Sequence, residues 1–281
     1  MLVSAKEMLE KAKAGHYAVG QFNINNLEWT KSILLTAKEL RSPVILGVSE
    51  GAGKYMGGYD VVVGMVNGLL KDLDIDVPVA LHLDHGTSRE ACEAAIAAGF
   101  SSIMFDGSHL PFRENLAITR HLVTLAHSKG ISVEAELGTI AGSEDGIVNS
   151  EVIYADPQEC YTLVTETQVD CLAAALGSTH GLYKGKARLG FTEMKAIAEQ
   201  VKVPLVLHGG TGIADEDMRR AIACGTAKIN VNTENMYAWC QQVKAIFAAD
   251  TGHDVNDPRK VIAQGLQPVR EMIARRMALF G

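Results

Sequence analysis

The chain has 281 residues, of which 47% are hydrophobic and 21% charged, close to the averages of globular proteins. Its formal net charge of −7 argues against a general nucleic-acid binder, because such proteins gather Lys and Arg to neutralise phosphates. No apolar stretch approaches the roughly 20 residues that a membrane span requires. We therefore expect neither nucleic acid nor a membrane among its partners.

The cysteines and the first residues indicate the compartment. The five cysteines are scattered and form no C-x-x-C pair, which is typical of reduced thiols in a cytosolic protein. Residues 1–7 (MLVSAKE) open an amphipathic helix and lack the apolar segment of a signal peptide. The sequence therefore predicts a cytoplasmic protein.

Short apolar runs that end in polar or glycine residues alternate with stretches of helical periodicity. The strands expected from these runs, in chain order, are 18–25, 44–49, 79–85, 102–108, 131–138, 171–177, 204–210 and 228–233. The helices expected between them include 30–40, 89–98, 115–129, 157–167, 192–200 and 215–224. Gly99, Gly130 and Gly225 stand where helix C-caps are expected.

Regular alternation of strand and helix implies parallel strands joined by helical crossovers. Eight such units in about 250 residues match the size of a closed (β/α)8, or TIM, barrel of the α/β class. A doubly wound open sheet is the competing fold, but its glycine-rich dinucleotide fingerprint is missing after the first strand. With no linker or composition break, we expect residues 1–281 to form a single barrel domain with a C-terminal helical segment at about 257–281.

Titratable residues gather at the ends of the expected strands, where barrel enzymes assemble their active sites. These residues are Asp84, His85, Asp106, Glu134, Glu136, His180 and His208. Three histidines from different strands, His85, His180 and His208, can converge on one ion and leave a fourth position open, as expected of catalytic zinc. A lone histidine at a strand end is more often structural. His82 alternates to a different side of the strand from His85, so it is a candidate either for packing or for supporting the metal ligands without binding the ion.

Two carboxylates have alternative interpretations. Asp84 is either a helix N-cap or salt-bridge partner, or a general acid/base beside the metal. Strand alternation turns its side chain away from that of His85 unless the strand end bends. Glu144 lies in a loop of small residues, which is either an exposed loop or a mobile lid that carries a catalytic group.

Two polar segments at the ends of expected strands, the first of them rich in glycine, favour phosphate binding. Residues 209–212 (GGTG) and 230–233 (NVNT) each precede a helix, and backbone N–H groups at helix starts bind phosphate. The loops after the seventh and eighth strands commonly form the phosphate site of barrels. A glycine cluster is also typical of a tight turn, but two clusters in these positions favour an anion site.

Five segments resemble the class II fructose-bisphosphate and tagatose-bisphosphate aldolases. They are HLDHG at 82–86, VEAELG at 133–138, GSTHG at 177–181, VLHGGTG at 206–212 and KINVNT at 228–233. The resemblance extends from about residue 3 to the C-terminal segment without large gaps. It implies a lyase of carbohydrate metabolism that reversibly cleaves a ketose 1,6-bisphosphate and assembles as a homodimer or homotetramer.

The resemblance also implies roles for individual residues. His85, His180 and His208 would bind the catalytic Zn²⁺, and Asp106 and Glu136 would hold a second divalent ion or a monovalent cation. Asp84 would transfer the proton of the substrate C4 hydroxyl, and Glu144 would protonate the enediolate carbon. Substrate contacts are implied at Asn23, Ser49, Gly181, Lys184, Gly209, Gly210, Thr211, Asn230, Val231, Asn232 and Thr233, and across a dimer interface at Arg259.

Other activities compete with this interpretation. Fructose 1,6-bisphosphate is favoured because residues 181–185 (GLYKG) look closer to fructose-type members, with tagatose 1,6-bisphosphate or another anionic ketose phosphate as the alternative. A Schiff-base aldolase needs a lysine near a strand end, but Lys228 begins the expected eighth strand and Lys184 lies in a loop. A non-catalytic sugar-phosphate-binding barrel is disfavoured because every expected ligand and both proton-transfer carboxylates are present.

Overall fold

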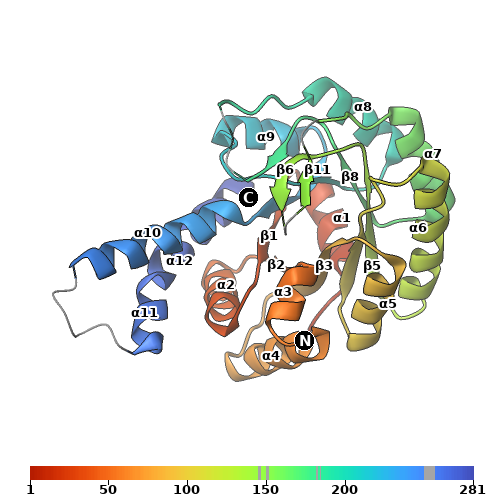
Figure 1. Cartoon of the computed structure of the whole chain (residues 1–281). Coiled ribbons are helices and arrows are strands. Elements are labelled where there is room, and N and C mark those ends of the chain that lie inside the picture. Colours follow the sequence, from red (N-terminus) through yellow and green to blue (C-terminus); the bar gives the residue numbers. More distant parts are fainter. Residues whose placement is uncertain (145–146, 150–151, 182, 184, 250–256) are drawn as a thin grey trace.

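The computed structural model describes residues 1–144, 147–149, 152–181, 183, 185–249 and 257–281; of residues 143, 144 and 147–149 only the backbone is described. Its parallel strands close into an eight-stranded barrel in the order β1-β11-β10-β8-β5-β4-β3-β2 (Figure 1). The strands are β1 (Val19–Asn23), β2 (Val44–Val48), β3 (Val79–Gly86), β4 (Ser102–Phe105), β5 (Ser132–Leu137), β8 (Cys171–Ala174), β10 (Leu205–Leu207) and β11 (Thr226–Val231). The predicted (β/α)8 barrel is confirmed.

Helices cover the outside of the barrel (Figure 1). They are α2 (Leu27–Leu40), α3 (Glu50–Tyr55), α4 (Tyr59–Asp72), α5 (Arg89–Ala98), α6 (Phe112–His127), α7 (Pro157–Thr167), α8 (Phe191–Val201) and α9 (Asp215–Ala223). Local sequence sets their bounds, as α5 illustrates. The Ser88 hydroxyl accepts a hydrogen bond from Ala91 N at 3.1 Å, and Gly99 ends the helix with φ of 104°. Among the described residues, no helix is both long and apolar enough to cross a bilayer.

The first helix, α1 (Ala5–Gly15), closes the N-terminal end of the barrel. Its Met8 and Leu9 join the inward-facing Val19, Ile45 and Ala80 in a core of their own, separate from the larger core between strands and helices. The chain just before and within α1 is hydrogen-bonded to the starts of strands β3 and β5. Helix α1 and this apolar core therefore close the N-terminal end of the barrel, and the mouth lies at the opposite end, where the strands finish.

Strand β3 is distorted at its C-terminal end. Its register against β4 shifts between Leu83 and Gly86, and His85 adopts a left-handed φ of 50°. This irregularity breaks the strict alternation of the strand, as β-bulges do. Asp84 and His85 consequently both face the mouth of the barrel. Strand alternation had allowed this orientation only if the end of the strand bends.

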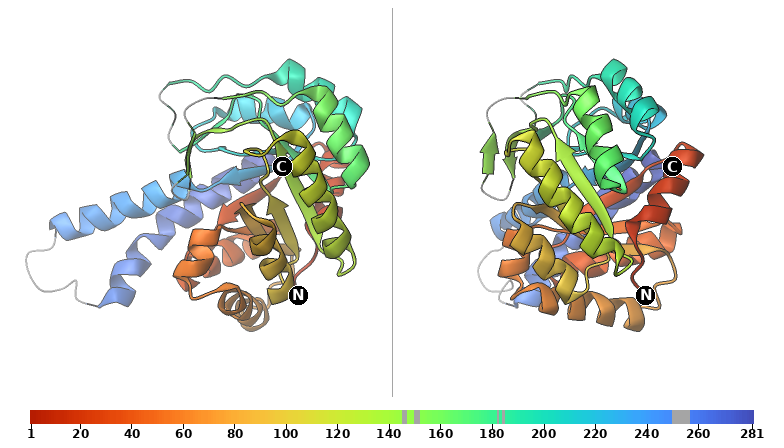
Figure 2. Two further views of the ribbon diagram at one scale, coloured as in Figure 1. Left: turned by 45° about the vertical axis from the view of Figure 1, so that its right-hand side comes forward. Right: turned by 90° about the vertical axis from the view of Figure 1, so that its right-hand side faces the viewer.

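The C-terminal helices form an arm. Helices α10 (Thr233–Ala249) and α11 (Pro258–Gln264) project away from the barrel, and α12 (Leu266–Phe280) runs back to it (Figures 1 and 2). At the base of the arm, Ala18 N donates to Phe280 O at 3.0 Å, so the last helix abuts the first strand. The expected helical segment at about 257–281 corresponds to α11 and α12, and α10 is the helix expected after residues 230–233.

A small second sheet lies beside the mouth. It consists of β6 (Ala141–Glu144), β7 (Ile147–Asn149) and β9 (Thr179–His180), in the order β7-β6-β9. Gly142 is paired with His180 across β6 and β9. The segment expected to be a loop around Glu144 therefore has strand backbone and is tied to the element that carries a predicted metal ligand.

Candidate active site

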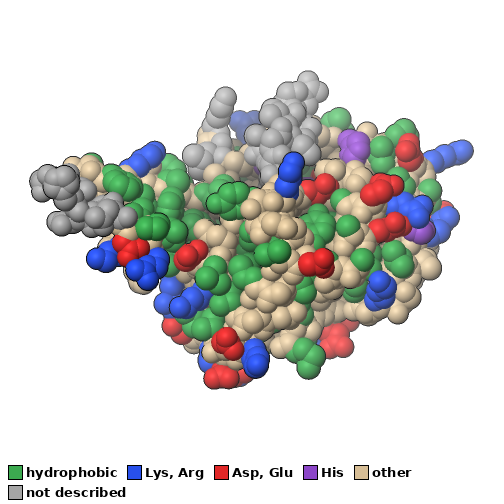
Figure 3. Space-filling model, turned by 60° about the horizontal axis from the view of Figure 1, so that its bottom comes forward, with side chains coloured by type: hydrophobic (Ala, Val, Ile, Leu, Met, Phe, Trp, Pro, Cys, Tyr) green, Lys and Arg blue, Asp and Glu red, His purple; other side chains and the backbone are tan. Residues whose placement is uncertain are grey.

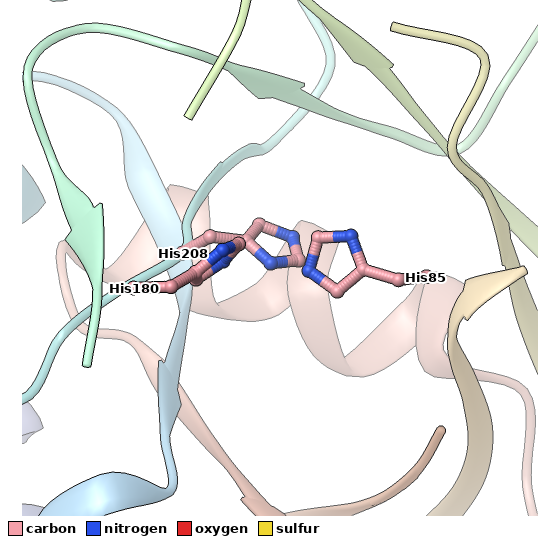
Figure 4. Close-up of side chains that lie close together, drawn as sticks. All are labelled: His85, His180 and His208. Atoms are coloured by element: carbon pink, nitrogen blue, oxygen red, sulfur yellow. The ribbon is translucent and has the colours of Figure 1, made fainter. Parts of the chain in front are cut away.

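Three histidines from separate elements meet at the mouth of the barrel. His85 ends β3, His180 ends β9, and His208 directly follows β10. One ring nitrogen of each lies within 4.8 Å of the others. The ring centroids are 4.5 Å apart for His85 and His208, 5.0 Å for His85 and His180, and 6.0 Å for His180 and His208, and the rings converge in Figure 4. Such a set of imidazoles suits a divalent transition metal.

Two carboxylates adjoin this cluster. Asp106 Oδ2 lies 2.8 Å from His85 Nδ1, and Glu136 Oε2 lies 3.9 Å from the same nitrogen. With His85 they form a second group whose potential ligand atoms lie within 4.8 Å of one another. Burial alone would raise the pKa of Asp106, but hydrogen bonds from His85 and Ser108 lower it below its usual range. The group therefore offers negative oxygen ligands to a second cation.

Asp84 is buried beside the histidines and is held by two amides. Asn23 Nδ2 donates to its Oδ2 at 2.9 Å, and Asn230 Nδ2 donates to its Oδ1 at 3.2 Å. Burial opposes ionisation, but His85, His208 and Lys228 outweigh it and lower the pKa of Asp84 below its usual range. The carboxylate is thus an oriented proton acceptor.

The side-chain carbonyl oxygens of the same two asparagines are available to a ligand. Asn23 Oδ1 and Asn230 Oδ1 are buried, and no group in the described part of the chain donates a hydrogen bond to either. Buried acceptors without a donor are uncommon and costly. They are suited to receive hydroxyl groups of a bound polyol.

A cavity of about 20 Å³ lies beside His180 at the mouth. Its lining consists of residues that the sequence had marked: Asn23, His180, Gly181, Gly209, Gly210, Thr211, Asn230, Asn232 and Thr233. Glycine is required at 209, because φ is 66° and an added Cβ would lie 2.3 Å from Thr179 O. Helix α10 begins at Thr233, which lines this cavity, and its Glu234 N–H donates to Thr211 Oγ1 at 3.3 Å, so the start of the helix adjoins the cavity.

The remaining predicted contacts lie elsewhere. The Ser49 hydroxyl accepts from Ala52 N at 3.1 Å and caps α3 at the end of β2. The side chain of Val231 is buried in the main core, which leaves only its backbone for a ligand. Lys184 and the side chain of Glu144 are outside the described residues.

Arg259 is not brought to the mouth of its own barrel. It belongs to α11 on the arm, is largely exposed, and pairs with Asp257 through Nη2 at 2.9 Å. The expected contact of Arg259 with a ligand across a dimer interface stays a prediction.

The family model described as fructose-bisphosphate aldolase class-II matches residues 3–281. The chain belongs to the class II fructose-bisphosphate aldolase family. It is 58% identical over 280 residues to the fructose-bisphosphate aldolase of Geobacillus stearothermophilus, with 100% of this chain and 97% of that one covered. It is 54% identical over 280 residues to that of Staphylococcus aureus (strain Mu50), with the same coverage. Among solved structures, the YdjI aldolase of Escherichia coli K12 matches with a TM-score of 0.87 and 33% identity, covering 100% of this chain and 98% of that one.

This family is generally zinc-dependent, and the donor set of the chain fits such an ion. Burial and the neighbouring His85 lower the pKa of His208, which favours the neutral imidazole that binds metal. His208 Nε2 lies 2.7 Å from Glu134 Oε1, and a carboxylate can only accept. The proton is therefore on Nε2, and Nδ1, to which Asn230 Nδ2 donates at 3.1 Å, is the nitrogen left with a lone pair that could bind a metal ion.

Sequence reasoning missed a polar layer one step inside the barrel. Strand β11 begins at Thr226, two residues before the expected start, so Lys228 is buried within the barrel rather than at the first position of the strand. Its Nζ lies 2.6 Å from Glu134 Oε2. Burial would raise the pKa of Glu134, but Lys228 and the hydrogen bond from His208 lower it below its usual range. The signal in the sequence that could have indicated this layer was Lys228 itself, a lysine inside an otherwise apolar run.

Proposed function

We propose that this chain is a zinc-dependent class II aldolase that reversibly cleaves fructose 1,6-bisphosphate to dihydroxyacetone phosphate and glyceraldehyde 3-phosphate. The observation that carries the proposal is the meeting of His85, His180 and His208 beside the buried Asp84. Family membership and the two bacterial relatives, both fructose-bisphosphate aldolases by name, support the same reaction.

Each part of the site has a chemical task in this reaction. A bound zinc ion supplies Lewis-acid polarisation of the substrate carbonyl and stabilises the negative charge that develops next to it. Asp84, aimed by Asn23 and Asn230, accepts the C4 hydroxyl proton as the C3–C4 bond breaks. Residues 209–211 and 230–233 bind the phosphate through backbone N–H groups and the start of α10. We assign the return of a proton to the remaining three-carbon fragment to Glu144.

Metal removal tests the proposal directly. Chelator-stripped protein is expected to lose cleavage activity and regain it with zinc, whereas a Schiff-base enzyme would stay active without metal. His180→Ala should lose both zinc and activity. His121→Ala, at an exposed histidine of α6, is the matched control and should lose neither. Full turnover of stripped protein would refute the proposal.

The sugar is a separate question. We favour fructose 1,6-bisphosphate over tagatose 1,6-bisphosphate, which differs in one hydroxyl configuration, and over other anionic ketose phosphates. The test compares kcat/KM of zinc-loaded protein on the two epimeric bisphosphates. A higher value for the tagatose substrate would transfer the assignment to the alternative without affecting the reaction class.

We further propose a cytoplasmic homodimer or homotetramer that acts as one barrel domain per chain. The arm supports assembly because it exposes Met236, Tyr237 and Phe247, with exposed fractions of 37%, 54% and 50%. Hydrophobic side chains are visible along the projecting arm at the left of Figure 3. On the face drawn there, acidic and basic side chains are interspersed, which gives no support to a nucleic-acid site.

A further inference from the structure

A column of hydrogen-bonded polar side chains descends from the histidine cluster into the barrel. Glu134 is its centre, with Oε1 2.7 Å from His208 Nε2 and Oε2 2.6 Å from Lys228 Nζ. The exposed fractions are 1% for His208, 0% for Glu134 and 1% for Lys228. A buried ion pair is often no more stabilising than apolar side chains of similar volume. Stability alone therefore gives little reason for an ion pair at this depth.

The lower part of the column fixes the lysine. Lys228 Nζ lies 3.4 Å from His82 Nε2, and His82 Nδ1 lies 2.7 Å from Ser102 Oγ. Burial and the charge of Lys228 lower the pKa of His82 to about 3, so this ring is neutral. An ammonium group can only donate, so His82 Nε2 accepts and Nδ1 carries the hydrogen. Lys228 is thus held between two acceptors, Glu134 and His82.

The upper part of the column fixes His208. The ion pair with Lys228 orients the carboxylate of Glu134, whose second oxygen accepts the Nε2 hydrogen of His208. Only Nδ1 then retains a lone pair, and in this structure that lone pair accepts a hydrogen bond from Asn230 Nδ2 at 3.1 Å. A carboxylate that holds a ligand histidine in this way sets both its tautomer and its ring orientation.

We propose that Lys228 and Glu134 are positioning residues that act through His208 and present its Nδ1 to the metal ion. This inference rests on the proposed zinc site. It assigns a role to the lysine other than Schiff-base formation, since Nζ is paired inside the barrel below the mouth. Neither residue touches the substrate in this arrangement.

The test replaces the pair without leaving a buried charge. Glu134→Met combined with Lys228→Met fills a similar volume with apolar side chains, so the metal-free double variant should unfold near the wild-type temperature. Zinc binding, measured by competition with a chromophoric chelator, should weaken about 10–100-fold, as for other partners of metal ligands. The visible absorption of the cobalt-substituted variant should change as well, because the geometry at His208 is no longer fixed.

Controls separate positioning from folding. Arg276→Met removes another buried cation, one that pairs with Glu234 outside the column, and should leave zinc affinity unchanged. If the double variant fails to fold, the isosteric Glu134→Gln removes only the charge of the acceptor and should still weaken zinc binding about tenfold. Wild-type zinc affinity in either folded variant would overturn the inference. Failure of the wild-type chain to bind zinc would instead overturn the proposed function.

Discussion

Asp84 has its two carboxylate oxygens occupied by different asparagines, which leaves the group little freedom to rotate. Asp84→Asn should lower kcat about 10²–10⁴-fold, the usual contribution of a positioned general base. Zinc content should be retained, because the three histidines are untouched. The measurement pairs steady-state kinetics with metal analysis of the same sample. Asp60→Asn, at an exposed position of α4, is the control, and an Asp84 variant as active as this control would contradict the assignment.

A second prediction at the scale of single residues concerns the buried thiol of Cys160. Burial, followed by the charges of Asp156 and Glu159, raises the pKa of Cys160 to about 12 from its ordinary value of 9.0. Above pH 9 the unfolded chain loses this proton while the folded chain keeps it, so the free energy of unfolding falls as pH rises.

Cys160→Ala should therefore show a shallower decline of unfolding free energy between pH 9 and 11, by up to about 1.4 kcal/mol per pH unit. Urea titrations across this range measure the slope, which is independent of the packing that the substitution also removes. Cys240→Ala, at a half-exposed position of α10, should keep the wild-type slope. Identical slopes in all three proteins would exclude a thiol contribution.

Individual site residues differ in how far the sequence predicts them. The three histidines are brought together because His85 lies near the end of β3, His180 in the segment after β8 and His208 directly after β10, and parallel barrel strands all end at one mouth. The orientation of Asp84 relative to His85 was not predictable. It depends on a left-handed φ of 50° at a non-glycine residue, which strand periodicity does not encode.

At the scale of elements, strand β6 controls the position of a histidine to which it is not covalently adjacent. Gly142 in β6 has φ of 108°, and an added Cβ would lie 2.2 Å from His180 O. Gly142→Ala should push β9 away and misplace His180. We expect turnover to fall about 100-fold, as displacements near 1 Å can cost that much.

Kinetics together with zinc affinity check the Gly142 prediction, since a displaced ligand should affect both. Gly130→Ala is a matched control, because it imposes the same unfavourable positive φ, 71°, with no atom within 4 Å of the added Cβ. Equal losses in the two variants would indicate general backbone strain instead of displacement of His180.

Element boundaries were predictable where local signals are strong. Helices α5 and α7 begin and end at the expected residues, since each has a capping side chain at its start. Strand β6 was not predictable, because the run AGSE lacks strand propensity and one of its two partners, β9, is distant in sequence. Strand β11 was expected to begin at Lys228, but it begins at Thr226. The sequence therefore did not show that Lys228 lies inside the barrel.

For the whole molecule, the arm is the exposed part that assembly would cover. Tyr237→Glu combined with Phe247→Glu places charges on α10 and should weaken association by about 2 kcal/mol for each aromatic that is central to an interface. Sedimentation velocity should then show monomers at concentrations where wild type is assembled. Tyr161→Glu, at an exposed position of α7 on the other side of the barrel, should not change assembly. A monomeric wild-type chain would contradict the proposed oligomer.

The way in which the barrel closes has a consequence for biosynthesis. The barrel is sealed by pairing of β1 with β11, and α12 returns to β1 only at Phe280. A nascent chain on the ribosome therefore lacks the third histidine until His208 has been made, and the seam until β11 ends at Val231. The three expected ligands of the proposed zinc ion can meet only after β10 has been made, so metal loading comes late in synthesis or after it.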